Sequence, residues 1–212
     1  MKKLLVLGAG GHGGSVADAA MQMRRWQGIE FYDDRAAPGS EAYGFLVRGT
    51  STELLGRSFA ADDAPEIFVA IGDNARRLEL VREVMHAGAT LATVIHPAAV
   101  VGSRVTIGAG SVLMAGAVVN IAARIGVGCI INTGASVDHD CAIGDGVHVC
   151  PGVSLAGNVQ ISDLAWIGIG STVIQGRKIG SRAVVGAGSV IIRDVENDVT
   201  MVGNPARELP LE

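Results

Sequence analysis

The chain has 212 residues and a formal net charge of −4 without any run of basic residues, which argues against a nucleic-acid-binding surface. Hydrophobic residues make up 49% of the sequence, enough for a buried core, but no apolar stretch is long enough to span a membrane. Glycine contributes 30 residues, about twice its usual share, and aromatic residues only 4%, which suits a narrow aliphatic core between tight turns. The three cysteines are an odd number without CxxC spacing; Cys129 and Cys141 are expected to be packing thiols in a reducing cytoplasm, and Cys150 to point outwards as a bystander near the site.

Residues 1–97 alternate between strand and helix signals. Short apolar runs predict strands at Leu4–Leu7, Glu30–Tyr32, Ile67–Ile71 and Thr90–Ile95. Helical spacing predicts helices over residues 14–25 and 75–87. The alternation predicts a small, mostly parallel α/β domain of the Rossmann-like type, ending where His96-Pro97 breaks the pattern.

A glycine-rich loop, Gly8-Ala9-Gly10-Gly11-His12-Gly13, joins the first strand to the first helix and matches GxGxxG. The amides of such a loop and the helix N-terminus bind phosphate, and Asp33 and Asp34, about twenty residues on, can accept from a ribose hydroxyl or a base N–H. The domain is too short to hold the second half of a dinucleotide site, so a nucleotide diphosphate fits better than NAD. The alternative is a tight glycine turn that binds nothing.

From residue 98 onward a six-residue period replaces the α/β pattern. Every sixth position is Val, Ile or Leu, as in Val101, Ile107, Leu113, Val119, Ile125, Ile131, Val137, Ile143, Val149, Leu155, Ile161, Ile167, Val173, Ile179, Val185 and Ile191. One hexapeptide on each of three sides closes one coil, so the period predicts a left-handed parallel β-helix of hexapeptide repeats over residues 98–195. Residues 196–212 leave the register and are expected to form a C-terminal tail.

Residues eighteen apart share a column of this β-helix, which places Gly157 beside His139 on the next coil. His139 at an outward corner is a candidate general base, the Gly157 N–H a candidate oxyanion donor, and Asp138 or Asp140 can orient the imidazole. The alternative is that His139 is only an exposed corner residue. His148 shares a column with Trp166 and either lies by the site or packs an interface. The apolar outward residues Ile130, His148, Trp166 and Val184 predict a homotrimer.

Several motifs together resemble one family, the PglD/NeuD-like sugar acyltransferases, bacterial enzymes that acetylate amino or hydroxyl groups of sugars, many of them nucleotide-linked. The resemblance covers nearly the whole chain. The motifs that carry it are the GAGGHG loop, Tyr32-Asp33-Asp34, Ala70-Ile71-Gly72-Asp73-Asn74, Ile95-His96-Pro97, the hexapeptide repeats and Val202-Gly203-Asn204-Pro205-Ala206-Arg207.

The resemblance implies a role for each matching position. His139 is the general base, Asp140 follows it where the family often has Glu, and the Gly157 N–H contacts the thioester carbonyl. Asn132 contacts the sugar, and the other acceptor-binding positions are Gly8, Gly10, Gly11, His12, Asp33, Asp34, Gly72, Asp73 and Asn74. Acetyl-CoA lies between adjacent β-helices of a trimer, towards the C-terminal coils, and the positions expected to bind it are His148, Gly157, Trp166, Ile169, Ala187 and Pro205.

The leading hypothesis is an acetyl-CoA-dependent N-acetyltransferase that acts on a nucleotide-linked amino sugar in the cytoplasm, without a metal. An alternative is O-acetylation of a sugar such as a sialic acid, with the same base. A γ-carbonic-anhydrase-like zinc enzyme would need three histidines across an interface, whereas this β-helix offers two. A non-catalytic nucleotide-sugar-binding protein is a further alternative, disfavoured by the pairing of His139 with Gly157.

Overall fold

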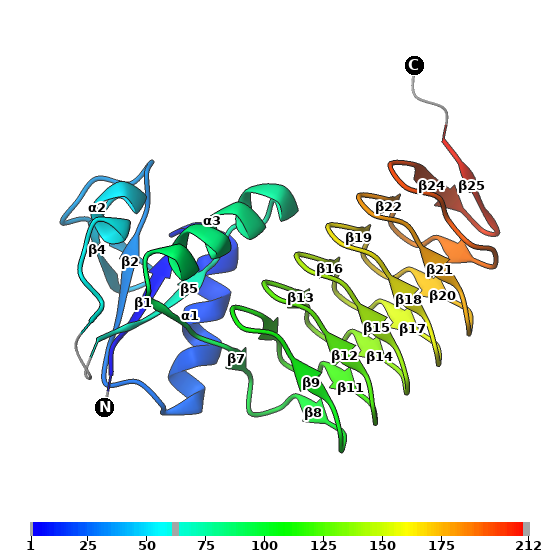
Figure 1. The fold of residues 1–212 in the computed structure, drawn as a ribbon, viewed down its shortest axis with the longest axis horizontal. Helices are drawn as coiled ribbons and strands as arrows, with labels where there is room; N and C mark the ends of the chain where they lie inside the picture. Colours follow the sequence, from blue (N-terminus) through cyan, green and yellow to red (C-terminus); the bar gives the residue numbers. More distant parts are fainter. Residues whose placement is uncertain (1, 61–63, 210–212) are drawn as a thin grey trace. The chain divides into compact units, whose positions relative to one another are not determined.

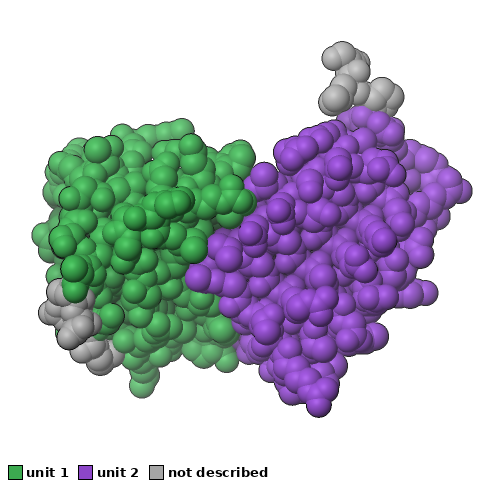
Figure 2. Space-filling model, viewed as in Figure 1, with its two compact units in different colours: residues 1–97 green, residues 98–212 purple. Residues whose placement is uncertain are grey.

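The computed structural model describes residues 2–60 and 64–209. The chain divides into two compact units, Met1–Pro97 and Ala98–Glu212, which are coloured separately in Figure 2. Unit 1 is a Rossmann-like α/β domain and unit 2 is a left-handed β-helix, so the predicted fold class is confirmed (Figure 1). Among the described residues, no helix is both long and apolar enough to cross a bilayer.

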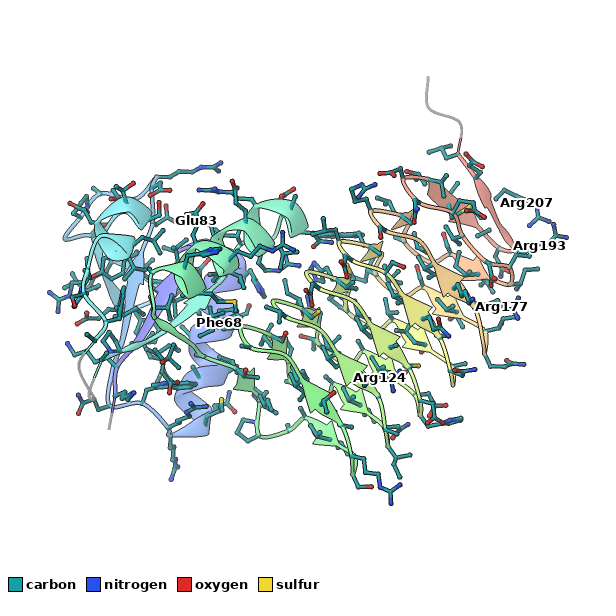
Figure 3. All side chains as sticks on the ribbon, viewed as in Figure 1. Phe68, Glu83, Arg124, Arg177, Arg193 and Arg207 are labelled. Atoms are coloured by element: carbon teal, nitrogen blue, oxygen red, sulfur yellow. The ribbon has the colours of Figure 1, made fainter. Side chains whose placement is uncertain are left out.

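Unit 1 is built on a six-stranded sheet with the strand order β3-β4-β2-β1-β5-β6. Its strands are β1 (Leu4–Leu7), β2 (Ile29–Tyr32), β3 (Glu41–Ala42), β4 (Phe45–Gly49), β5 (Glu66–Val69) and β6 (Thr90–Leu91), and the short β7 (Val94–Ile95) follows. All pairings are parallel except that of β3 with β4. The central strands β1 and β5 are buried at every position, as parallel strands covered on both faces must be. Phe68 of β5, labelled in Figure 3, is fully buried.

The described residues of unit 1 also form the helices α1 (Gly11–Met23), α2 (Ser51–Leu55) and α3 (Asn74–His86). Helix α1 contacts β1 and β7, and α3 contacts β5 and β6. The sequence placed the start of α1 three residues too late, because glycines disfavour a helix and concealed its first turn. The hairpin β3–β4 and α2 were missed altogether. Helix α2 begins with a capping box, in which the side chains of Thr50 and Glu53 each accept from the other residue's backbone N–H, and this motif could have predicted the helix.

Unit 2 stacks short strands coil on coil along three flat sides (Figure 1). The first side holds β10 (Val112–Leu113), β13 (Ile130–Ile131), β16 (His148–Val149), β19 (Trp166–Ile167), β22 (Val184–Val185), β24 (Thr200–Gly203) and β25 (Ala206–Glu208). The second side holds β8 (Val100–Val101), β11 (Val118–Val119), β14 (Ser136–Val137), β17 (Ser154–Leu155), β20 (Thr172–Val173) and β23 (Val190–Ile191). The third side holds β9 (Thr106–Ile107), β12 (Arg124–Ile125), β15 (Ala142–Ile143), β18 (Gln160–Ile161) and β21 (Lys178–Ile179).

The six-residue register predicts the interior of unit 2 correctly. Parallel pairing joins residues eighteen apart, such as Val119 with Val137, and every register residue from Leu113 to Ile191 is buried. The residue before the register position is exposed or half-buried at most coils, as for the exposed Arg124, labelled in Figure 3, whereas Val112, Ile130 and His148 on the first side are buried. Nine corner glycines have positive φ, the conformation for which glycine is favoured, namely Gly110, Gly116, Gly128, Gly134, Gly146, Gly152, Gly170, Gly176 and Gly188.

The tail changes the register without leaving the sheet. Val184 pairs in parallel with Thr200, where an eighteen-residue spacing would have placed residue 202. After the turn at Asn204-Pro205, β25 runs back antiparallel to β24. Residues 200–208 therefore extend the first side of the β-helix by a hairpin, a pairing that the sequence did not predict.

Candidate active site

A cleft of about 630 Å³ lies at the carboxyl ends of the strands of unit 1. The loops that follow β1, β2 and β5 line it, and β1 and β5 flank the point where the strand order reverses, the usual ligand site of such sheets. Of the residues predicted to hold the acceptor, five line the cleft, namely Gly8, Gly10, Asp33, Asp34 and Asp73. Gly11, His12, Gly72 and Asn74 are not among the lining residues, although their loops are.

The N-terminus of α1 opens at this cleft without a side-chain cap. Gly10 is the N-cap residue, it has no side chain to accept from the helix amides, and the first turn contains no acidic residue. The first four N–H groups of a helix lack partners within the helix, and the helix dipole makes this end positive. The loop can therefore receive an anion through its amides.

Two glycines of this loop have different functions. A Cβ on Gly13 would lie 2.0 Å from the carbonyl oxygen of Gly8, so Gly13 allows helix and strand to pack closely. A Cβ on Gly10 would meet no protein atom within 4 Å, and its φ of −76° suits any residue. Neither packing nor backbone conformation requires glycine at Gly10, so the space above it is available to a ligand.

The two carboxylates that follow β2 hold the loops around the cleft. Asp33 accepts from the backbone N–H of Ala9 at 2.7 Å, and also from those of Arg35 and Ala36. Burial alone would raise the pKa of Asp33, but these three donors and the charge of Arg35 lower it overall. Asp34 accepts from the backbone N–H and the hydroxyl of Ser51, 2.7 and 2.8 Å away.

A buried arginine fixes the loop after β5. Arg77 is fully buried, and its guanidinium donates to the carbonyl oxygens of Ile71 and Gly72 and, at 2.8 Å, to the Oδ1 of Asn74. Gly72 and Asn74 thus shape the loop by bonding to Arg77. Sequence analysis missed Arg77, because its position inside an amphipathic helix pattern resembled an ordinary surface charge.

His12 lies in the first turn of α1 with its Nε2 inaccessible to solvent and without a hydrogen-bond partner among the described residues. Burial, together with the positive charge of Arg77, lowers the pKa of His12 to about 4. The imidazole is therefore neutral at physiological pH.

The predicted base in unit 2 lies where column arithmetic placed it. His139 is at the corner after β14, and a Cβ added to Gly157 would lie 2.5 Å from its Nε2. A side chain at Gly157 would force this imidazole to move. In the part of the chain that the structure describes, the Gly157 N–H donates to no protein acceptor.

The other ring nitrogen of His139 is held by a carboxylate. Nδ1 lies 2.9 Å from Oδ2 of Asp140, which fixes the Nδ1–H tautomer and leaves the Nε2 lone pair free. Asp140 itself has a φ of 60°, and its N–H donates to the carbonyl of Ile121. The hydrogen bond to Asp140, then the charge of Asp138, raise the pKa of His139 above its ordinary value. A stronger base at the free nitrogen is the consequence.

Asp138 contributes through the backbone. Its Oδ1 accepts from the N–H of His139 and from the side-chain amide of Asn120, both at 2.8 Å. These two hydrogen bonds lower the pKa of Asp138 and keep it ionised. Asn120 was missed by the sequence analysis, although it precedes Asp138 by one coil and the same column arithmetic could have found it.

A second group of predicted residues lies at the preceding corner, between the first and second sides. Asn132 Nδ2 lies 3.1 Å from Nε2 of His148, whose ring packs edge-on against Trp166 with centroids 4.3 Å apart. A groove of about 350 Å³ beside them is lined by His148, Trp166, Ile169 and Ala187, but not by Pro205. Cys150 also lines it, and burial raises the pKa of its thiol to about 12, which excludes a thiolate nucleophile at neutral pH.

Within one chain the two corners stay apart. Strand β14 lies between Asn132 and His139, and one side of the coil spans up to about 20 Å of extended chain. The structure therefore places His139, Asp140 and Gly157 together, and Asn132, His148 and Trp166 together, but does not join the two groups. Among the described residues, no cluster of three His, Cys, Asp or Glu side chains could hold a metal ion.

Comparison with known proteins gives matches to both units. Residues 3–84 match the family model of the PglD N-terminal domain. The chain is 41% identical to the acetyltransferase domain of PglB from Neisseria gonorrhoeae FA1090, with 99% of this chain and 100% of that chain covered and a TM-score of 0.93. No match was found among curated proteins.

Several of the similar structures contain bound molecules. The same PglB domain in complex with acetyl coenzyme A is 40% identical, covers 98% of this chain and 99% of its own, and has a TM-score of 0.93. PerB from Caulobacter crescentus, in complex with CoA and GDP-perosamine, is 36% identical, with 99% and 98% covered and a TM-score of 0.90. Because such identities extend over nearly the whole of both chains, the chain belongs to the PglD/NeuD-like family of sugar acyltransferases, enzymes that use acetyl-CoA.

Proposed function

We propose that the protein transfers the acetyl group of acetyl-CoA to the amino group of a nucleotide-linked amino sugar. The observation that carries this proposal is the free Nε2 of His139, held in its tautomer by Asp140 and directed at Gly157 of the next coil. Similar structures support the substrate class, since one relative is in complex with acetyl coenzyme A and another with CoA and GDP-perosamine.

The reaction needs one base and no covalent intermediate, because a thioester is already activated. The neutral amine attacks the thioester carbonyl carbon while His139 Nε2 takes a proton from the amine. The Gly157 N–H donates to the oxyanion of the tetrahedral intermediate. The C–S bond then breaks, and the imidazolium returns its proton to the departing sulfur, giving the amide and free CoA.

The cleft of unit 1 holds the nucleotide in this proposal. The uncapped start of α1 takes the diphosphate, and the open space above Gly10 allows its oxygen atoms to approach. Asp33 and Asp34 keep unused acceptor lone pairs for a ribose or base, although their first function is to hold the loops.

We also propose a homotrimer. One chain keeps the His139 corner away from the Asn132–His148 corner, and three-fold packing of β-helices can bring the first corner of one subunit to the second corner of its neighbour. Ile169 and Val184 are exposed beside the groove, Ile169 at 56%, and the half-buried Trp166 adds to this apolar surface. Ile130 and His148 are already buried within the chain, so the apolar surface left for packing between subunits is smaller than the sequence alone suggested.

The cytoplasm is the compartment that we propose. All three cysteines are free and buried, as is usual in reducing surroundings.

The test is a thiol-release assay with acetyl-CoA and a panel of nucleotide-linked amino sugars, run beside their hydroxyl counterparts and sialic acids. Release of CoA with an amino sugar, lost in His139→Asn, supports the proposal. Release with hydroxyl acceptors alone supports O-acetylation. Tight binding of a nucleotide sugar without any CoA release points to a non-catalytic binding protein. Sedimentation of a stable monomer at micromolar concentration contradicts the trimer.

A further inference from the structure

The hairpin between β3 and β4 carries an unusual turn residue. Its two-residue loop is Tyr43-Gly44, and both residues have positive φ, 52° and 78°. Such turns favour Asn, Asp or Gly at the first position, because an ordinary side chain is strained there. A tyrosine at this position marks a backbone outlier of the kind that gathers at ligand sites.

The ring of Tyr43 rests directly on the backbone of α1. A Cβ on Gly14 would lie 2.8 Å from two carbons of this ring and 2.9 Å from a third. Gly14 is inside the helix, where glycine is less favourable than alanine, and only glycine leaves room for the ring. Two locally unfavourable choices, Tyr43 in the turn and Gly14 in the helix, therefore combine to fix one aromatic ring.

The hydroxyl of Tyr43 reaches the open end of α1. Its oxygen lies 4.0 Å from the Cβ position of Gly11, the first residue of the helix. Tyr43 is 63% exposed, and within residues 2–60 and 64–209 its hydroxyl has no protein partner. The residues just before it, Ser40, Glu41 and Ala42, line the cleft of unit 1. The phenol is thus a free donor beside the uncapped amides.

We infer that the Tyr43 hydroxyl donates a hydrogen bond to the diphosphate of the nucleotide-linked acceptor and thereby positions it. This inference rests on the proposed function. The helix amides attract an anion to their end, and the phenol lies at the same end, so both act on one group. A neutral donor suits a cleft whose ionisable lining includes the carboxylates of Asp33, Asp34, Glu41 and Asp73 beside Arg35 and Arg76.

The decisive variant is Tyr43→Phe, which keeps the ring on Gly14 and removes only the hydroxyl. We expect the acceptor KM and the inhibition constant of the matching nucleoside diphosphate each to rise about tenfold, because a hydrogen bond to a charged group is lost. The inhibition constant of the free nucleoside, the KM for acetyl-CoA and the melting temperature should all stay at their wild-type values.

A second variant, Gly14→Ala, retains the hydroxyl but displaces the ring that carries it. It should raise the same two acceptor constants while the added methyl supports the helix. Tyr43→Phe with wild-type constants for acceptor and diphosphate would show that the ring only fastens the hairpin to the helix, which overturns the inference and leaves the proposed function intact. A wild-type protein that binds no nucleoside diphosphate overturns both.

Discussion

The two units provide their functional groups in different ways. Unit 1 offers backbone amides at the start of one helix, and its side chains Asp33, Asp34 and Arg77 mainly hold the surrounding loops. Unit 2 offers side chains at the corners of a repetitive scaffold, where His139 is held by one neighbour and accommodated by a glycine on the next coil. This difference means that substitutions in the two units should affect different kinetic constants. Changes in unit 1 should alter acceptor binding, and changes at the β-helix corner should alter the rate of the chemical step.

The sharpest test of this division is His139→Asn. The imidazole is exposed at a corner, so folding should be preserved, while kcat should fall by roughly two to four orders of magnitude for loss of a general base. Steady-state rates with purified variant, together with a melting curve, measure both quantities. Near-normal acetyl transfer would remove His139 from the mechanism, and a lower melting temperature would give it a structural function instead.

The neighbouring coil gives a subtler way to disturb the same base. In Gly157→Ala the new methyl would lie 2.5 Å from Nε2 of His139, so the imidazole must move. Displacing a catalytic group by about 1 Å can cost roughly a hundredfold in rate, and we expect a fall of about that size in kcat. The acceptor KM should change little. An unchanged kcat would mean that the ring can shift without loss.

A matched pair of glycine variants tests unit 1. Gly13→Ala forces a methyl against a backbone carbonyl and should lower the free energy of unfolding of unit 1 by about 3 kcal/mol or more. Gly10→Val meets no protein atom at its Cβ and should leave stability nearly unchanged, yet raise the acceptor KM about tenfold by blocking approach to the amides. Denaturant unfolding and initial rates distinguish the two. A Gly10→Val enzyme with wild-type KM for both substrates would place the nucleotide elsewhere.

The smallest expected effect concerns pH. Because Asp140 and Asp138 raise the pKa of His139, the acidic limb of the kcat/KM profile should lie above the ordinary histidine value. In Asp140→Asn the pKa should fall, so the limb should move to lower pH while the plateau drops about tenfold, since the base is weaker and less well oriented. A limb that stays in place would show that Asp140 does not tune His139.

How much the sequence predicts differs between the units for a physical reason. In unit 2 each coil repeats the same contacts, so a six-residue pattern predicts the register, the interior, the corner glycines and the approach of His139 to Gly157. Asn120 follows the same rule and was overlooked. The six-residue period, which holds at sixteen consecutive positions, ends before the tail. The shortened coil of the tail and its returning strand β25 follow no such pattern.

In unit 1 the sequence predicts the alternating strands and helices and the glycine loop, because these depend on local patterns. It misses features that depend on how the elements pack, and elements too short to show a pattern. Arg77 bonds to a loop five or six residues earlier only because α3 turns back over β5, and the hairpin that carries Tyr43 is too short for an alternation signal. Asp33 and Asp34 lie beside the glycine loop, where the sequence put them, but the sequence did not show that Asp33 already accepts from Ala9 and Asp34 from Ser51.

The column that joins His139 to Gly157 also limits how this enzyme can evolve. The pairing of one coil with the next, as in Ser136 with Ser154 and Ser154 with Thr172, is the same at every step, so a complete coil can be gained or lost away from the base without altering its surroundings. Loss of a single residue between the two positions would rotate the glycine out of the column and bring a side chain against the imidazole. In this stretch, insertions and deletions among natural relatives are therefore expected to comprise whole coils.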